Sequence, residues 1–197
     1  MVVTFEYKMY STQEHQERMF ETLEVLRHLY NNSLSERIDA WKYENVHLNY
    51  CKQANQLPGL KKESLLTSVY SHVAQDALRR LDKAFANFYR RVNEKKAGKK
   101  IKAGFPRFKG IGRYRSFTYP EWGNGVSLRL RDDKEGEAKD AILHLSKIGD
   151  IPVRLHRPLQ GTPKTATISH KADGWYVSIA CVVEPEPLPK TGKGCRH

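Results

Sequence analysis

The sequence is poor in cysteine and has no long apolar run. Its 197 residues include three cysteines, Cys51, Cys181 and Cys195, which are far apart and odd in number. They predict neither a disulfide framework nor a zinc-binding pair, and they favour a cytosolic protein. No apolar stretch approaches the roughly 20 residues that a membrane-spanning helix needs, so we expect no membrane partner. The amino-terminal stretch also lacks the basic start and apolar core of a signal peptide.

Patterns that carry catalysis are equally scarce. The eight histidines are scattered, and none forms a His-x-His or His-x-x-x-His pair, which argues against a metal site. The glycine-rich stretch 109–113 lacks the spacing and the Lys-Ser/Thr ending of a phosphate-binding loop. Glu184 and Glu186 are each followed by a proline, which favours an extended linker over a catalytic pair. We therefore expect no catalytic residue, no metal site and no cofactor in this chain.

Positive charge is what the sequence has in excess. The formal net charge is +12, which is typical of a protein with a polyanionic partner such as nucleic acid. Residues 79–115, here called the basic segment, hold fourteen basic and two acidic residues, while the rest of the chain is balanced. Solvated lysines at a helix end are the alternative interpretation, but they account poorly for an entire imbalance within one segment. We interpret the basic segment as a nucleic-acid-binding surface.

Aromatic residues alternate with cations in the second half of the basic segment and just beyond it, in GFPRFK (104–109) and YRSFTY (114–119). In such a pattern cations neutralise phosphates while rings stack on unpaired bases. Composition favours equally the alternative that Phe105, Phe108 and Phe117 are core residues at the edge of a small β-barrel. The residues predicted to contact nucleic acid are Arg79, Arg80, Lys83, Arg90, Arg91, Lys95, Lys96, Lys99, Lys100, Lys102, Phe105, Arg107, Phe108, Lys109, Arg113, Tyr114, Arg115, Phe117 and Tyr119.

The amino-terminal half predicts one strand and two long helices. Residues 2–10 alternate in the period of a strand. Ser11 with a glutamate three positions later has the form of a capping box, so a helix is expected over about 12–41. A second apolar stripe predicts a helix over 61–92. Residues 42–59 between them are polar, which favours a loop or a frayed helix end.

The carboxy-terminal half predicts strands. Asp173-Gly174 is a strong signal for a hairpin. The order strand, helices, strands predicts an α+β protein, with a helical domain inserted after the first strand of a small β-barrel. The strands are expected at 126–130, 142–146, 151–155, 164–170 and 175–183, with a charged turn at 132–140.

Four stretches resemble the TnpB family of transposon-encoded proteins. YKMYSTQEHQ (7–16) is similar to the opening strand and YPT-x-x-Q helix start of that family, with Ser11 where proline is usual. LYNNSL (29–34) is similar to its YN-x-x-L helix. The most specific match is AFANFYRR (84–91) followed by GFPRFK (104–109). The pattern is completed, over essentially the whole chain, by SFTY (116–119), Ile148-Gly149, HRPL (156–159) and GWYVSI (174–179).

The family consists of RNA-guided DNA nucleases related to compact type V CRISPR effectors. The resemblance implies a wedge domain, which is an oligonucleotide-binding-like β-barrel, interrupted by a helical recognition domain. Guide RNA and target DNA would be the partners, because base pairing reads sequence while protein reads shape, backbone and a short flanking motif. The implied divisions are the first wedge strand at 1–10, the recognition domain with its basic loop at 11–104, the rest of the barrel at 105–183, and a linker at 184–197.

The sequence departs from the family at its carboxy terminus. In the family, a segment like LPKTG (188–192) leads into a RuvC-like nuclease domain that opens with a Gly-Ile-Asp strand, whereas this chain ends at His197. Two-metal cleavage of DNA needs carboxylates, and those of the family, like its zinc-binding segment, would lie beyond that end. We therefore expect binding without nuclease activity, with Mg²⁺ and Zn²⁺ confined to the missing part. A nuclease domain acting in trans would be a further partner, and the expected location is the prokaryotic cytoplasm, at the nucleoid.

A guide-independent DNA-binding protein of the helix-turn-helix type is the alternative. The helices expected over 12–41 and 61–92 would form its two-helix unit. Helix-turn-helix turns have three or four residues, whereas about eighteen polar residues separate these helices, which weakens this hypothesis.

Overall fold

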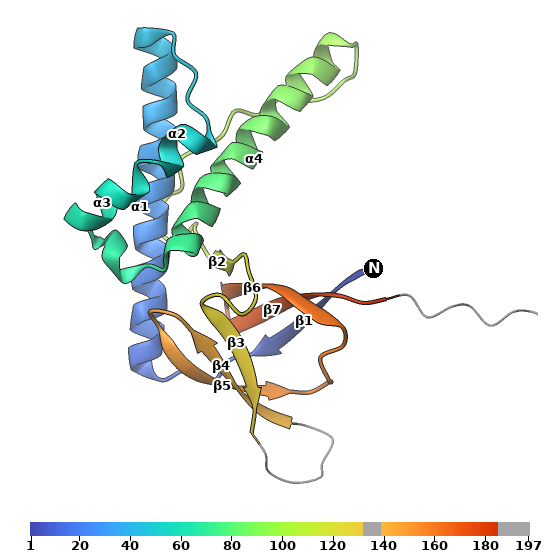
Figure 1. Ribbon diagram of the computed structural model, residues 1–197. Coiled ribbons are helices and arrows are strands. Elements are labelled where there is room, and N and C mark those ends of the chain that lie inside the picture. The colour runs from blue at the N-terminus through green and yellow to red at the C-terminus, as the bar shows by residue number, and fades with distance from the viewer. Residues whose placement is uncertain (132–138, 185–197) are drawn as a thin grey trace, which may run out of the picture.

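The computed structural model describes residues 1–131 and 139–184, with helices gathered on one side and strands on the other (Figure 1). This arrangement confirms the α+β class. The amino-terminal elements are β1 (Val2–Lys8), α1 (Gln13–Glu44), α2 (Tyr50–Ala54), α3 (Leu57–Glu63), the 3₁₀ helix η1 (Leu65–Ser68) and α4 (Ser71–Lys96). They are followed by β2 (Ser116–Tyr119), β3 (Val126–Leu130), β4 (Lys139–Leu145), β5 (Gly149–Leu155), β6 (Thr162–Lys171) and β7 (Gly174–Val182).

The strands form two antiparallel sheets, one in the order β1-β7-β6-β2 and the other in the order β3-β4-β5. A single bridge between Met9 and Val153 joins them, supported by the hydrogen bond that Tyr10 N donates to Pro152 O at 2.9 Å. A barrel requires continuous strand pairing around its wall, and the described strands do not provide it. The predicted closed barrel is therefore not confirmed, and two open sheets stand in its place.

Pairing of distant strands confirms that the helices are inserted after the first strand. β1 pairs along its whole length with β7, so that Phe5 lies opposite Ile179. The hairpin predicted at Asp173-Gly174 joins β6 to β7, and Gly174 has a φ of 131°, which suits glycine. Strand β2 was not predicted. The expected charged turn falls largely on residues 132–138, and the expected linker on 185–197, and both ranges lie outside the described residues.

Helix α1 begins one residue later than the capping-box pattern suggests. The cap is Thr12, whose side chain accepts a hydrogen bond from His15 N at 3.4 Å, so Ser11 is not the capping residue. The helix continues to Glu44 and ends at Asn45, which adopts the left-handed conformation with a φ of 53°. Asparagine tolerates that conformation better than most residues, which explains how α1 can end there without a glycine.

The prediction of a loop at 42–59 and one helix at 61–92 was wrong about where the helices begin and end. Helices α2 and α3 occupy part of the expected loop, and the chain turns at Ser64, which is extended and whose hydroxyl accepts from Leu66 N at 3.3 Å. Serine favours such local caps over a helix interior. The stripe still marked core residues, because Leu66, Val69 and Val73 are all buried, although they belong to separate elements.

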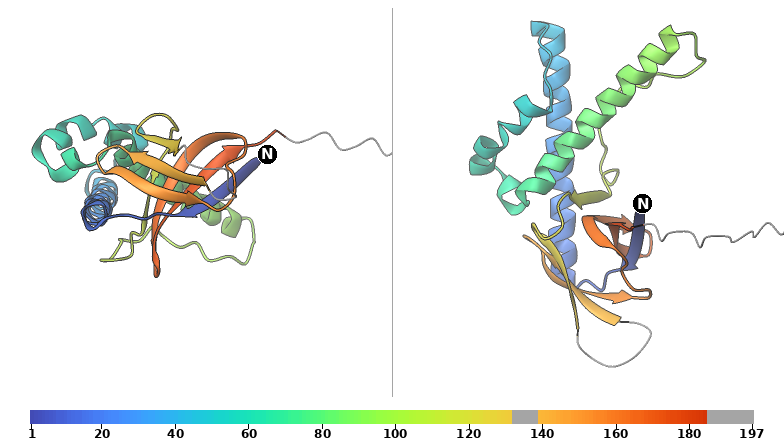
Figure 2. Two further views of the ribbon diagram at one scale, coloured as in Figure 1. Left: turned by 90° about the horizontal axis from the view of Figure 1, so that it is seen from below. Right: turned by 45° about the vertical axis from the view of Figure 1, so that its right-hand side comes forward.

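One apolar core joins the helices to both sheets. Helices α1 and α4 pack together near the sheets and diverge away from them, as Figure 1 and the right view of Figure 2 show. The buried residues of α4, from Val73 to Leu81, lie in its first half. The second half of α4 therefore projects beyond the core with the basic segment. Among the described residues, no helix is both long enough and apolar enough to cross a membrane.

Candidate nucleic-acid interface

Most of the predicted contact residues are exposed on the far half of α4 and on the segment 97–115 that returns from it (Figure 1). The buried apolar residues of α4 are confined to its first half, and the cations of its second half are exposed. The exposed members of the predicted set are Arg79, Lys83, Arg90, Arg91, Lys95, Lys96, Lys99, Lys100, Lys102, Phe105, Arg107, Phe108, Arg113 and Arg115.

The two acidic residues of the basic segment are held by arginines. Glu94 pairs with Arg90 at 2.7 Å, and this hydrogen bond lowers the pKa of the Glu94 carboxyl. Asp82 pairs at 3.1 Å with Arg37, which lies outside the basic segment and is buried. Both carboxylates are thus neutralised locally, and the remaining cations set the charge of this surface.

Arg80 has a different position from the other predicted contacts. Its guanidinium donates to Asp76 at 2.8 Å, to the Ser116 carbonyl at 2.7 Å and to the Thr118 hydroxyl at 2.6 Å. These hydrogen bonds join α4 to β2, so the side chain is engaged within the protein. Because Arg carries its donors in a fixed planar fork, this geometry leaves little of the group for a phosphate.

The aromatic members of the predicted set divide into two groups. Tyr114, Phe117 and Tyr119 are buried, with 1% exposure for Phe117 and Tyr119, so the core alternative holds for Phe117. Burial raises the pKa of the Tyr119 phenol, whose hydroxyl donates to the Ser146 carbonyl at 2.9 Å. Phe105 and Phe108 are 47% and 55% exposed, and their rings remain accessible for stacking.

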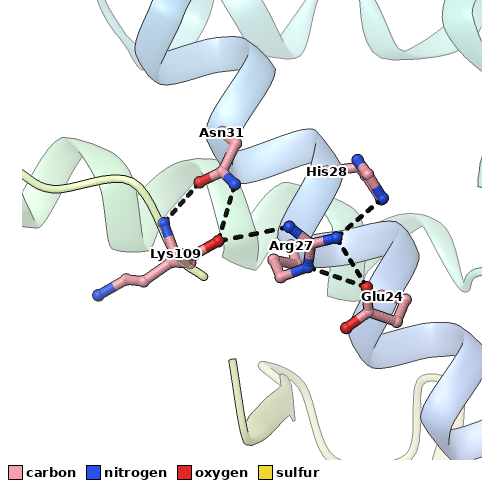
Figure 3. A network of polar contacts seen from close by, with 5 residues as sticks. All are labelled: Glu24, Arg27, His28, Asn31 and Lys109. Atoms are coloured by element: carbon pink, nitrogen blue, oxygen red, sulfur yellow. Dashed lines mark hydrogen bonds and ion pairs between the residues drawn. The ribbon is translucent and has the colours of Figure 1, made fainter. Parts of the chain in front are cut away.

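A hydrogen-bonded clamp holds the GFPRFK stretch against α1 (Figure 3). The Asn31 amide donates to the Lys109 carbonyl at 2.9 Å and accepts from the Lys109 backbone N–H at 2.8 Å. A side-chain amide that pairs with both backbone groups of one residue fixes the position of that residue. The Lys109 ammonium lies 5.5 Å from the centre of the Tyr30 ring, a cation–π distance.

Arg27 supports the clamp from the preceding turn of α1. It donates to the same Lys109 carbonyl at 3.4 Å, pairs with Glu24 at 2.8 Å and donates to His28 at 3.0 Å (Figure 3). Its side chain is 12% exposed, so these bonds are partly shielded from water. The clamp therefore gives the loop a fixed path along α1, with Arg107 and Phe108 exposed to solvent.

Sequence reasoning missed both Arg27 and Asn31 as site-forming residues. Asn31 was quoted only as part of the YN-x-x-L resemblance, and the motif gave no reason for the asparagine. The hydrogen bonds to Lys109 supply that reason. In the part of the chain that the structure describes, no three His, Cys, Asp or Glu side chains gather where they could hold a metal ion.

Comparisons with known proteins found one matching family model and two related proteins that are described here. A family model described as a helix-turn-helix domain, of the OrfB_IS605 type, matches residues 1–45. These residues form β1, a short connection and the single helix α1. The chain is 30% identical to a protein of Streptomyces pristinaespiralis over 95% of its own length, and 28% identical to InsQ of Escherichia coli K12 over 78%. Both relatives are described as candidate RNA-guided DNA endonucleases.

The exposed cations and these matches define a nucleic-acid-binding, transposase-associated protein. The resemblance to TnpB-type proteins that the sequence motifs carry is confirmed. It spans 43% of the length of the Streptomyces protein and 34% of InsQ.

Proposed function

We propose that this chain is the nucleic-acid-binding module of a TnpB-type system, and that it holds a guide RNA and the target DNA beside its short flanking motif. The observation that carries the proposal is the exposed basic segment, whose loop is fixed on α1 by the Asn31–Lys109 clamp. A fixed array of cations and exposed rings suits a structured RNA scaffold or a heteroduplex recognised by its backbone.

The wedge and recognition domains are part of the same proposal. Residues 1–10 and 105–183 would form the wedge, here as two open sheets, and residues 11–104 the recognition domain. The printed names of both relatives, as RNA-guided DNA endonucleases, support guide RNA and target DNA as partners. A DNA partner would place the chain at the nucleoid.

Binding without cleavage is the activity that we propose for this chain by itself, with cleavage supplied by a nuclease domain in cis or in trans. The full chain would be purified from cells that carry its own genetic element, and the retained RNA would be sequenced. Enrichment of one noncoding RNA over bulk RNA is the expected result, and retention of bulk RNA alone would contradict the proposal. Target DNA incubated with this complex and Mg²⁺ should stay intact, whereas cleavage products would show an activity of its own.

Guide-independent binding to duplex DNA is a second candidate, favoured by the match of residues 1–45 to a helix-turn-helix domain model. In the structure α1 and α4 are separated by residues 45–70, which include α2, α3 and η1, and no three-residue turn joins them. Footprinting of a specific duplex in the absence of RNA would support this candidate.

A further inference from the structure

A concave surface lies between the far halves of α1 and α4, the two helices that diverge in Figure 1. This aromatic groove has a volume of about 800 Å³, within the range of small-molecule sites. Its walls are built mainly from rings, which come from α1, α4 and the returning basic segment: Trp41, Phe85, Phe88, Tyr89 and Phe105. Large apolar surfaces of this kind on a soluble protein mark a binding site more often than chance.

Three of the rings pack edge-on against one another. Phe105 meets Phe85 edge-on at 5.5 Å and Phe88 at 5.2 Å between ring centres, so the three rings support one another. Trp41 is 62% exposed on the opposite wall, contributed by α1. A flat apolar group that entered the groove would find a ring on either side.

A buried hydrogen-bond donor also belongs to this groove. Arg37 lines it and is 7% exposed. Its Nε donates to Gln53 at 2.8 Å and its Nη1 to Asp82 at 3.1 Å, whereas its Nη2 has no partner among the described residues. The guanidinium lies 5.2 Å from the centre of the Phe85 ring. A buried donor without a partner is costly, and a shift of the Arg37 side chain that brought Nη2 to an acceptor atom on a ligand would relieve that cost.

The charged side chains that line the groove favour a ligand that carries negative charge. Arg37 and Lys42 are cationic, and none of the described residues that line the groove is acidic. Phe105 is itself part of the basic segment, so a polyanionic strand held by that segment would pass beside the groove. Rings for stacking, a buried donor for a carbonyl or ring nitrogen, and cations for the flanking phosphates together match a nucleotide better than an apolar side chain.

We propose that the aromatic groove takes up an unpaired nucleobase from a single strand, which stacks between the walls and accepts a hydrogen bond from Arg37. This inference rests on the proposed function and deepens it, because it assigns the base-contacting part of the interface to a site apart from the phosphate-contacting lysines.

The test is fluorescence anisotropy with the full chain and two labelled probes of equal length and charge, a 12-nucleotide oligouridylate and an abasic ribose-phosphate strand. Trp41→Ala should weaken oligouridylate binding about 5- to 150-fold, the range expected when one stacking ring is removed, and leave the abasic strand unaffected. The matched control is Tyr43→Ala on the same helix, 72% exposed and outside the groove. Because the Tyr43 ring lies against the Lys42 ammonium, any effect of this variant should be equal for the two probes. Because no phosphate contact is removed, the salt dependence of binding should be unchanged.

A second variant tests whether the effect of Trp41→Ala could come from local misfolding. Phe105→Leu keeps an apolar contact with Phe85 and Phe88 but removes a flat ring, and it should shift oligouridylate affinity in the same direction as Trp41→Ala. A third probe, an oligodeoxyuridylate, distinguishes DNA from RNA as the source of the base.

Equal behaviour of Trp41→Ala and Tyr43→Ala would overturn the inference. So would a wild-type dimer in sedimentation that Trp41→Ala disperses, because a second copy would then fill the groove. Failure of the wild-type chain to bind either probe at low salt would instead count against the proposed function.

Discussion

Replacement of Asn31 by alanine should release the GFPRFK loop from α1. The side chain makes two hydrogen bonds with the backbone of Lys109, at 2.9 and 2.8 Å. Each such bond contributes about 0.5–1.5 kcal/mol net, so their removal corresponds to about 1–3 kcal/mol. Because Arg27 still donates to the same carbonyl oxygen, we expect the lower part of that range, about 1–2 kcal/mol.

Limited digestion with trypsin measures this release, because the enzyme cleaves after Arg107 and Lys109 when the loop opens. Where opening and closing are fast, the cleavage rate follows the open population, and about 1–2 kcal/mol raises it about 5- to 30-fold. Asn32→Ala is the matched control, since Asn32 is the next residue, is exposed, and makes no hydrogen bond to the loop among the described residues. Cleavage of Asn31→Ala at the rate of this control and of the wild type would refute the clamp.

Three further predictions follow from the same structure. Alanine at the four lysines Lys95, Lys96, Lys99 and Lys100 should weaken binding uniformly across sequences and reduce the salt slope by about 0.9 for each duplex phosphate that is no longer neutralised; an unchanged slope would mean that these lysines are only solvated. Phe117→Ala should destabilise the fold by about 3–5 kcal/mol in urea unfolding, since its ring is 1% exposed, whereas Phe108→Ala should cost little stability. The raised pKa of Tyr119 makes its contribution to stability fully present below its ordinary value of 10.0 and lost as pH rises through the folded-state value. The loss of stability as pH rises above about 10 should therefore be less steep in Tyr119→Phe, and an unchanged slope would contradict the burial effect.

The strands were the most predictable part of the fold. Alternation of apolar and polar residues located 126–130 at the bounds of β3, and Asp173-Gly174 located the β6–β7 hairpin, because both signals are local. Strand β2 was missed because it has only four residues and lies next to the basic segment, so its rings suggested binding. Closure of the sheets depends on pairing between distant strands, about which local patterns carry no information.

The candidate site was predictable in composition but not in geometry. Charge counting located the exposed cations of α4 and its return loop. It could not separate Arg80, which bonds to β2 residues 36 and 38 positions away, from neighbouring arginines in solvent. The two residues of the Asn31–Lys109 clamp are 78 positions apart, so no pattern in the local sequence could predict their contact. Arg37 lies outside the basic segment altogether, and only packing reveals its buried donor.

The most direct test of the account is ultraviolet crosslinking of the chain to its co-purified RNA, followed by mass spectrometry of the crosslinked peptides. Crosslinks should fall within the basic segment 79–115, with Phe105 and Phe108 as the exposed rings best placed to form them. Crosslinks confined to the β3-β4-β5 sheet, with the basic segment unmodified, would contradict the central claim that this segment is the nucleic-acid interface.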